Sequence, residues 1–214
     1  DYTKEDFTEL TIKLNDAAAW SDGTPVTSAD LVFTFEGQMK NEKLPYHAQF
    51  DQYVQEVKAV DEKTAVITFK IPAPRFAFEV LMLKFDTGIP IVPAHVLSKE
   101  ADVNAYQGGL EMAHSGPYNL VAWDANQKIF DLREDWWAVA AGRIALPAVK
   151  RVVMVNIGGQ VGQNMDTVIQ REVNNEFDAI LDVRSSVAKQ ILDSNAKITT
   201  HSGSNPPYGY LDWW

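Results

Sequence analysis

The chain has 214 residues, contains no cysteine, and carries 19 basic against 29 acidic side chains, which gives a net charge of −10. The missing cysteines exclude disulfides, thiolate metal sites and cysteine nucleophiles, and the negative charge argues against nucleic acid and anionic lipid as partners. No run of about 18 apolar residues occurs, so no transmembrane helix is predicted, and a leader or lipid anchor would have to lie upstream.

The first predicted element is a strand that ends in a tight turn. Apolar Leu10, Ile12 and Leu14 alternate with polar residues, which is typical of a half-buried strand. The strand leads to Trp20, which we expect to pack in the core. Asp22-Gly23 then supplies the turn, because glycine accepts a positive φ without a side-chain clash.

A helix is predicted after this turn, from Ser28 to about Lys40. Thr27 can cap it by accepting a hydrogen bond, and Asp30 adds a carboxylate near the positive end of the helix dipole. The apolar face of the helix consists of Leu31, Val32, Phe35 and Met39.

A hairpin is the next predicted element. Residues 57–60 and 64–71 would pair around a turn at Asp61-Glu62-Lys63. One face of the second strand consists of Ala65, Ile67, Phe69 and Ile71. Together with the strand at residues 10–14, the hairpin predicts an antiparallel meander with a helix laid on it.

A proline-rich crossing follows the hairpin. Residues 76–85 are apolar enough to form a buried helix or a buried extended segment. Pro90 and Pro93 keep residues 89–94 extended, because each proline restricts itself and the residue before it. A short helix is expected from Val96 to about Ala101, and the polar, irregular residues 102–114 suggest a domain boundary.

From residue 116 onward the pattern changes. Residues 118–123 and 128–133 predict a second hairpin, and residues 149–157 predict a strand that is covered on both faces. Helices are expected at residues 164–175 and 186–193, and further strands at residues 179–183, 197–200 and 208–214. This β-α-β-α-β order indicates a mixed sheet with covering helices.

Four ordered blocks carry a resemblance to a known family. They are WSDGTPVTSADLVFTFE from Trp20, GIPIVPAHVL from Gly88, SGPY from Ser115, and REDWW from Arg133. The chain resembles the family 5 extracellular solute-binding proteins, the receptors of bacterial ABC importers for oligopeptides, dipeptides, nickel and oligosaccharides. The last block matches only in part, because the family usually shows asparagine, proline, aspartate, tyrosine and tryptophan there.

The resemblance implies a mixed α+β and α/β fold like that of periplasmic binding proteins, with an extra small domain. Family members are more than twice as long, so it also implies a fragment that lacks the second lobe. Residues 1–112 would form the small α+β domain. Residues 113–214 would form part of the first ligand-binding lobe and end at the hinge.

The sequence offers little support for catalysis or for a bound metal. Gly158-Gly159-Gln160-Val161-Gly162 lacks the spacing of a dinucleotide site. The four histidines, at positions 47, 95, 114 and 201, form no metal-binding pair. Glu134-Asp135 indicates a solvated turn, with Trp136 or Trp137 capping the lobe core, because adjacent acids point apart and cannot flank one glycosidic bond. We expect neither an enzyme nor a cofactor.

Aromatic residues near the end of the chain are the main candidates for ligand binding. On a strand Tyr208 and Tyr210 would share a face, and Trp213 would lie on the other. The resemblance places the hinge strand along the cleft floor, where these rings and Trp214 could stack on sugars or clamp a peptide.

By the geometry that the resemblance implies, two loops supply three further candidates. Asp182 and Arg184 end a predicted strand, where open α/β sheets gather ligands. Asp86 precedes the proline-rich crossing. A surface salt bridge or a loop cap is the alternative for each of these three residues.

These observations predict a binding protein that captures an oligosaccharide or an oligopeptide for import. The resemblance implies ABC permease subunits as partners, a monomeric state and an extracytoplasmic location, either periplasmic or lipid-anchored on the outer face of the cytoplasmic membrane. A carbohydrate-active enzyme or its accessory binding module is the alternative, because of the six tryptophans and the acidic balance. A sensory receptor with the same fold is a third possibility.

Overall fold

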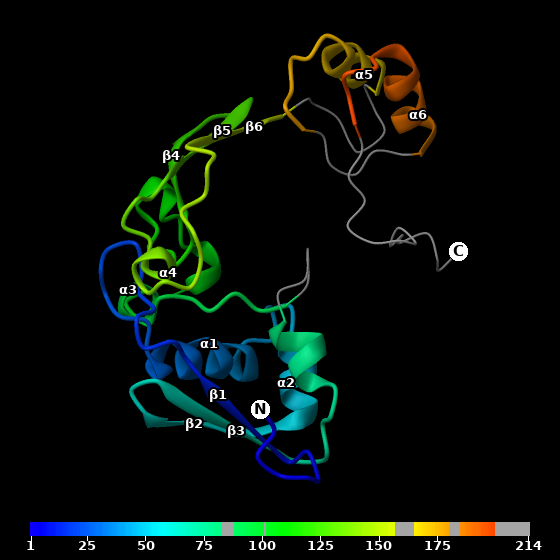
Figure 1. Cartoon of the computed structure of the whole chain (residues 1–214). Helices are drawn as coiled ribbons and strands as arrows, with labels where there is room; N and C mark the ends of the chain where they lie inside the picture. Colours follow the sequence, from blue (N-terminus) through cyan, green and yellow to red (C-terminus); the bar gives the residue numbers. More distant parts are fainter. Residues whose placement is uncertain (83–87, 101, 157–164, 180–184, 200–214) are drawn as a thin grey trace. The chain divides into compact units, whose positions relative to one another are not determined.

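The computed structural model describes residues 1–82, 88–100, 102–156, 165–179 and 185–199 (Figure 1). The chain divides into two compact units, Asp1–Trp123 with Lys128–Val153 and Asp124–Gln127 with Met154–Trp214. Helices and strands are mixed along the chain, as predicted. Among the described helices, none has both the length and the hydropathy that crossing a membrane would require. The predicted domain boundary between residues 112 and 113 stays a prediction.

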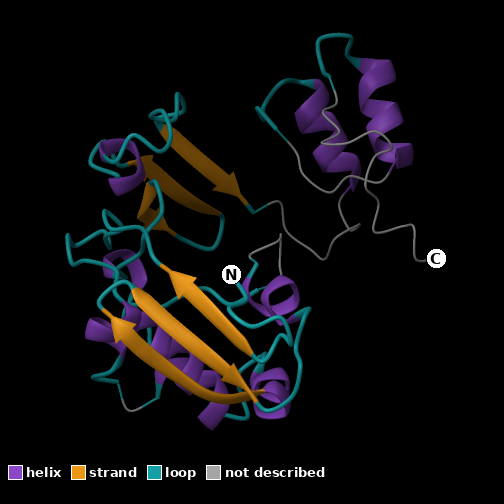
Figure 2. Ribbon diagram, turned by 60° about the horizontal axis from the view of Figure 1, so that its bottom comes forward, coloured by secondary structure: helices purple, strands orange, loops and turns teal. Residues whose placement is uncertain are grey.

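The first unit contains a three-stranded antiparallel sheet. It consists of β1 (Glu9–Lys13), β2 (Val54–Asp61) and β3 (Thr64–Phe69). The strand order is β1-β3-β2, so β3 lies in the middle (Figure 2). The predicted meander is therefore wrong in its order. Two helices lie between β1 and β2 in the chain, so these strands are not joined as a hairpin, and the returning strand β3 pairs with both of them.

Three helices accompany this sheet: α1 (Ser28–Lys40), α2 (His47–Tyr53) and the π-helical turn η1 (Ala77–Leu81). Helix α1 has the predicted bounds and packs against β2 and β3. Thr27 is the N-cap, as predicted, and forms a capping box with Asp30, whose carboxylate accepts the Thr27 N–H at 2.8 Å. A loop at residues 41–46 joins α1 to α2.

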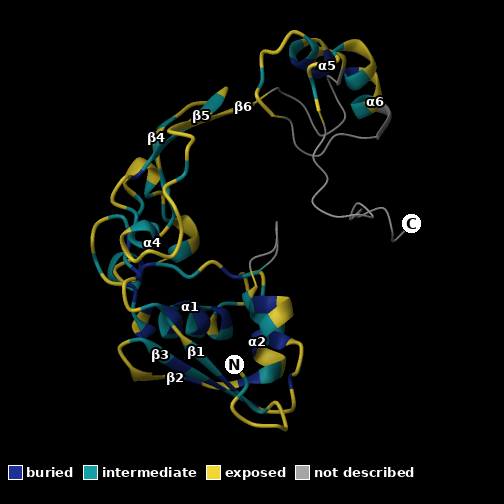
Figure 3. Cartoon of the chain, viewed as in Figure 1, coloured by how far each residue is buried: buried dark blue, intermediate teal, exposed yellow. Residues whose placement is uncertain are grey.

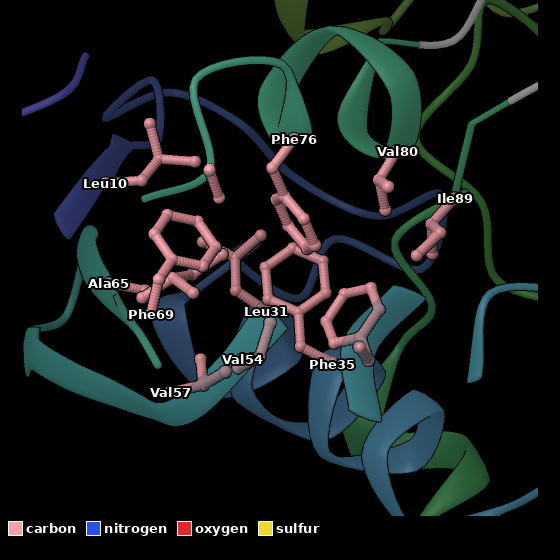
Figure 4. Packing of buried hydrophobic residues seen from close by; sticks show 13 residues of the cluster. Leu10, Leu31, Phe35, Val54, Val57, Ala65, Phe69, Phe76, Val80 and Ile89 are labelled. Atoms are coloured by element: carbon pink, nitrogen blue, oxygen red, sulfur yellow. The ribbon is translucent and has the colours of Figure 1, made fainter. Parts of the chain in front are cut away.

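The core of this unit is aromatic at its centre (Figure 4). The Phe50 ring lies 5.6 Å from Phe35 and 5.3 Å from Phe76, and Phe76 lies 4.9 Å from Phe69. Such tilted and edge-on arrangements are the favourable ones for aromatic pairs. The predicted inward face of β3 is correct except at Ile71, which is 47% exposed because the strand ends at Phe69.

Short helical turns form the connection to the next sheet. They are α3 (Ala94–Leu97), η2 (Val103–Ala105) and η3 (Gly109–Glu111). The helix predicted from Val96 begins two residues earlier, directly after Pro93, whose backbone is extended and lacks an N–H. Residues 102–114 are otherwise irregular, as predicted.

The second sheet has the order β4-β5-β6. The predicted hairpin is confirmed as β4 (Tyr118–Trp123) and β5 (Gln127–Leu132), which pair in antiparallel fashion. The short helix α4 (Trp137–Ala140) precedes β6 (Arg151–Val155). Arg151 holds Asp131 of β5 by two bonds of 2.6 and 2.7 Å.

The prediction that the strand around residues 149–157 is covered on both faces is wrong for β6. This strand lies at the edge of its sheet, and all five of its residues are exposed (Figure 3). Met154 is 55% exposed and Val153 is 45% exposed. A continuous apolar run indicates a strand, but the coverage of its faces depends on elements elsewhere in the chain.

The second unit contains α5 (Met165–Val173) and α6 (Ser185–Ser194), close to their predicted bounds. The two helices pack together and bury Val168, Ile169 and Ile191. The strand predicted at residues 197–200 is wrong for residues 197–199, which form a turn and coil. Most of the strand predicted at 179–183 and all of the one at 208–214 lie outside the described residues, so the predicted mixed sheet stays a prediction.

Two valines of β2 allow a matched test of this core. Val54 is fully buried, whereas Val60 on the same strand is 63% exposed. We expect Val54→Ala to lower the free energy of unfolding by about 2 kcal/mol, because it removes buried methyl groups and leaves a cavity. Val60→Ala should change it by less than about 0.5 kcal/mol. Urea denaturation of both variants measures the difference, and equal losses would contradict the assigned core.

Candidate functional site

The seven predicted ligand-binding residues all lie outside the described residues. They are Asp86, Asp182, Arg184, Tyr208, Tyr210, Trp213 and Trp214. The glycine-rich segment at residues 158–162 and His201 also lie outside them. Each predicted ligand contact therefore stays a prediction. The described residues do contain the junction where the four sequence blocks meet.

The buried Asp30 carboxylate is the centre of this junction. Asp30 is only 3% exposed, and its two oxygens accept three hydrogen bonds. Oδ2 accepts from the Thr27 N–H at 2.8 Å and from the Trp20 indole N–H at 3.3 Å, and Oδ1 accepts from the Ala94 N–H at 2.8 Å. A buried charge is tolerated when it is fully hydrogen-bonded in this way. One side chain thus joins the helix start, the buried indole and the proline-rich crossing.

Thr34 extends this junction by one helical turn. Its hydroxyl donates to the Asp30 carbonyl at 2.7 Å and accepts from the Val92 N–H at 3.1 Å. The crossing therefore rests on α1 at two points. The sequence did not predict Thr34, because a threonine in the middle of a helix carries no distinctive signal.

The turn at Asp22-Gly23 is anchored to the same crossing. Gly23 has a φ of +86°, as the turn requires. Asp22 accepts the Thr24 N–H at 2.9 Å and lies 2.8 Å from His95 Nε2. Burial alone would raise the pKa of Asp22, but the bonds from Thr24 and His95 outweigh it and hold the pKa below its ordinary value.

Ser115-Gly116 joins the third block to the fourth. The Ser115 carbonyl accepts both the Trp136 indole N–H at 2.9 Å and the Trp137 indole N–H at 3.1 Å. Trp137 also packs against a small core cluster that contains Trp20. The predicted capping of the lobe core stays a prediction. Glu134-Asp135 forms the predicted turn.

These polar groups are satisfied by one another, so the junction is suited to holding backbone segments together. Within the described ranges, no group of three or more histidine, aspartate or glutamate side chains could hold a metal ion. The described histidines have separate partners: His47 contacts the Gln38 carbonyl, His95 contacts Asp22 and His114 contacts Asn119.

A cavity of about 640 Å³ lies beside α1 in the first unit. Its walls come from α1, the loop after it and the crossing, and they are mostly apolar, with Phe33, Leu44 and Ile89 among them. The volume would suit a small ligand.

Comparison with known sequences identifies related proteins. The family model for bacterial extracellular solute-binding proteins, family 5 Middle, matches residues 1–212. Protein XP55 of Streptomyces lividans is 32% identical over 152 residues, which are 70% of this chain and 25% of that protein. The periplasmic oligopeptide-binding protein OppA of Salmonella typhimurium is 26% identical over 145 residues, 60% of this chain and 26% of that protein.

Solved structures share the fold. An oligopeptide-binding protein from Thermotoga maritima with bound mannohexaose has a TM-score of 0.75 at 23% identity and covers 97% of this chain. The oligopeptide-binding protein AppA of Bacillus subtilis in complex with a nonapeptide has a TM-score of 0.72 at 14% identity and covers 91%. The match spans 36% of each of those two chains, and about a quarter of each of the two curated relatives. The predicted fold class, that of periplasmic binding proteins, is confirmed.

The junction at Asp30 generates a stability prediction. We expect Asp30→Asn to lower the free energy of unfolding by about 2 to 3 kcal/mol, because the amide loses the charge and one acceptor while three buried N–H groups still need partners.

Asp22→Asn is the matched control in the same block. The Asp22 side chain is 42% exposed, so we expect a loss of less than about 1 kcal/mol. Chemical denaturation near neutral pH measures both variants. Equal losses of stability in the two variants would show that Asp30 does not hold these segments together more strongly than Asp22 does.

Proposed function

Because the chain belongs to the family 5 bacterial extracellular solute-binding proteins, we propose that it is part of the substrate-capturing subunit of an ABC importer. The family match over residues 1–212 carries this proposal. The fold similarity over 97% of the chain supports it. In this role the complete protein closes on a small ligand and presents it to a permease, without changing a covalent bond.

We propose an oligosaccharide as the ligand, with an oligopeptide as the alternative. Two tyrosines and two tryptophans within residues 208–214 support stacking on sugar rings, whose apolar faces leave water when they meet an aromatic ring. Relatives with bound mannohexaose and with a bound nonapeptide show that this fold can hold either class.

Within this proposal the aromatic residues Tyr208, Tyr210, Trp213 and Trp214 supply contact area. Asp182, Arg184 and Asp86 supply polar contacts, because a few directed hydrogen bonds fix a ligand's orientation within a mostly apolar site. We further propose a monomer, a permease as partner and an extracytoplasmic location; one relative is named periplasmic.

Titration calorimetry on the complete protein tests the proposed function. Mannohexaose, a cello-oligosaccharide and a mixture of oligopeptides are the ligands, and the products are checked by mass spectrometry. We expect saturable binding of an oligosaccharide, with every ligand recovered intact; binding of the peptides alone would favour the oligopeptide alternative. Hydrolysis of the sugar would favour the alternative, a carbohydrate-active enzyme, and failure of both ligand classes to bind would count against the proposed ligands.

The terminal tryptophans give the first binding prediction. We expect Trp213→Ala or Trp214→Ala to weaken sugar binding by about 1 to 3 kcal/mol, roughly five- to 150-fold, because a stacking surface is lost. Trp123→Ala is the matched control, since this tryptophan on β4 is 62% exposed and is not among the proposed contacts. Unchanged affinity in both terminal variants would remove these residues from the site.

The cavity beside α1 gives the second binding prediction. Gly37 lines this cavity, and a Cβ added there would lie 3.7 Å from the Leu44 side chain, an ordinary van der Waals contact, so Gly37→Leu introduces a larger apolar side chain at the cavity wall. Leucine also favours a helix more than glycine does. We expect the variant to fold and to bind the ligand with unchanged affinity. A loss of binding in a folded Gly37→Leu protein would place the ligand in this cavity.

A further inference from the structure

His114 lies where the irregular segment of the first unit enters the second sheet, and it touches three parts of the chain. Its backbone N–H donates to Ser21 Oγ at 3.1 Å, in the first sequence block. Its Nε2 lies 3.0 Å from Asn119 Oδ1 on β4. Its Nδ1 lies 3.3 Å from the Gly116 N–H. A half-buried imidazole therefore holds the backbone just before β4 and a side chain on β4.

The partners of the imidazole determine which nitrogen carries the proton. A backbone N–H can only donate, so Nδ1 accepts the bond from Gly116 and has no proton. The proton is then on Nε2, which donates to the Asn119 carbonyl oxygen. This arrangement requires a neutral ring, because a doubly protonated imidazole would present an N–H at Nδ1 to the N–H of Gly116.

Arg133 reinforces the neutral state from the carbonyl side of the same residue, Gly116. Its Nη1 donates to the Gly116 carbonyl at 3.1 Å, and Arg133 is only 6% exposed. Burial lowers the pKa of the His114 imidazole and the charge of Arg133 lowers it further, while the bond to Asn119 opposes them. Gly116 is thus held by a neutral acceptor at its N–H and by a cation at its carbonyl oxygen.

We propose that His114 is a proton-operated latch, which holds the segment Ser115–Tyr118 in place while the imidazole is neutral and releases it when Nδ1 is protonated. Release breaks the bond to Gly116 and places a second positive charge close to Arg133. The Ser115 carbonyl, which accepts both indole N–H groups of the fourth block, belongs to the same peptide group as the Gly116 N–H. Acid would therefore loosen the contact between the third and fourth sequence blocks.

Few other charges could compensate for the added proton. Asp135 lies 3.3 Å from Arg133 and is 77% exposed at its side chain, and Asp22, next to Ser21, is paired with His95. Glu111 on the preceding turn η3 is exposed.

The pKa of His114 is lower in the folded than in the unfolded chain, so the unfolded chain binds the proton more readily. Stability is therefore lost as the pH falls below about 6.5, the ordinary histidine pKa.

Nitrogen-15 NMR of the histidine rings and backbone amides, from pH 8 to pH 4.5, tests the latch on the unmodified chain. We expect the Nε2–H tautomer at neutral pH and a His114 titration midpoint below 6.5. The Gly116 amide and the Trp136 and Trp137 indole signals should shift with the same midpoint. A midpoint at or above 6.5, the opposite tautomer, or a Gly116 amide that ignores the titration would overturn the proposal.

His114→Gln and His47→Gln form a matched pair for urea denaturation at pH 7.5 and pH 5.5. We expect the urea midpoint of the unmodified chain and of His47→Gln to fall by similar amounts at the lower pH. His114→Gln should show a smaller fall, because it removes the titrating group. An equal fall in both variants would contradict the latch. If His114→Gln does not fold, the NMR titration of the unmodified chain decides alone.

Discussion

The structure of the first unit depends on one buried carboxylate. Asp30 receives N–H groups from three places in the chain: the residue before its own helix, the indole of Trp20 and the backbone at Ala94. Because a buried charge is costly unless its acceptors are used, any arrangement that separates these segments leaves the carboxylate unpaired. The proline-rich crossing is held on α1 in this way.

This constraint explains why the recognisable sequence blocks and the proposed ligand contacts are different residues. The blocks contain turn, cap and anchor positions, whose side chains bond to backbone groups or to one another. Trp136 and Trp137 share the carbonyl of Ser115, and Asp22 binds His95. The blocks identify the family by its scaffold, so they say little about which ligand the complete protein holds.

Local patterns predicted much of the fold, whereas long-range pairing could not be predicted from them. Thr27 and Asp30 defined the start of α1, and the alternation in residues 118–133 predicted β4 and β5, because caps and strand periodicity are local properties. The position of β3 between β1 and β2 depends on which strand the chain returns to. The exposure of β6 depends on what covers it. At the site, the partners of Asp30 at Trp20 and Ala94 lie 10 and 64 residues away, beyond the reach of any local pattern.

Hydrogen exchange of the backbone amides tests most directly whether Asp30 joins these segments into one cooperative unit. The amides of Thr27 and Ala94 both donate to this carboxylate although they are far apart in the sequence. The account predicts that both exchange slowly in the unmodified chain and that Asp30→Asn accelerates both by a similar factor. If only the Thr27 amide accelerates while Ala94 keeps its rate, the crossing is held by something else and the account is contradicted.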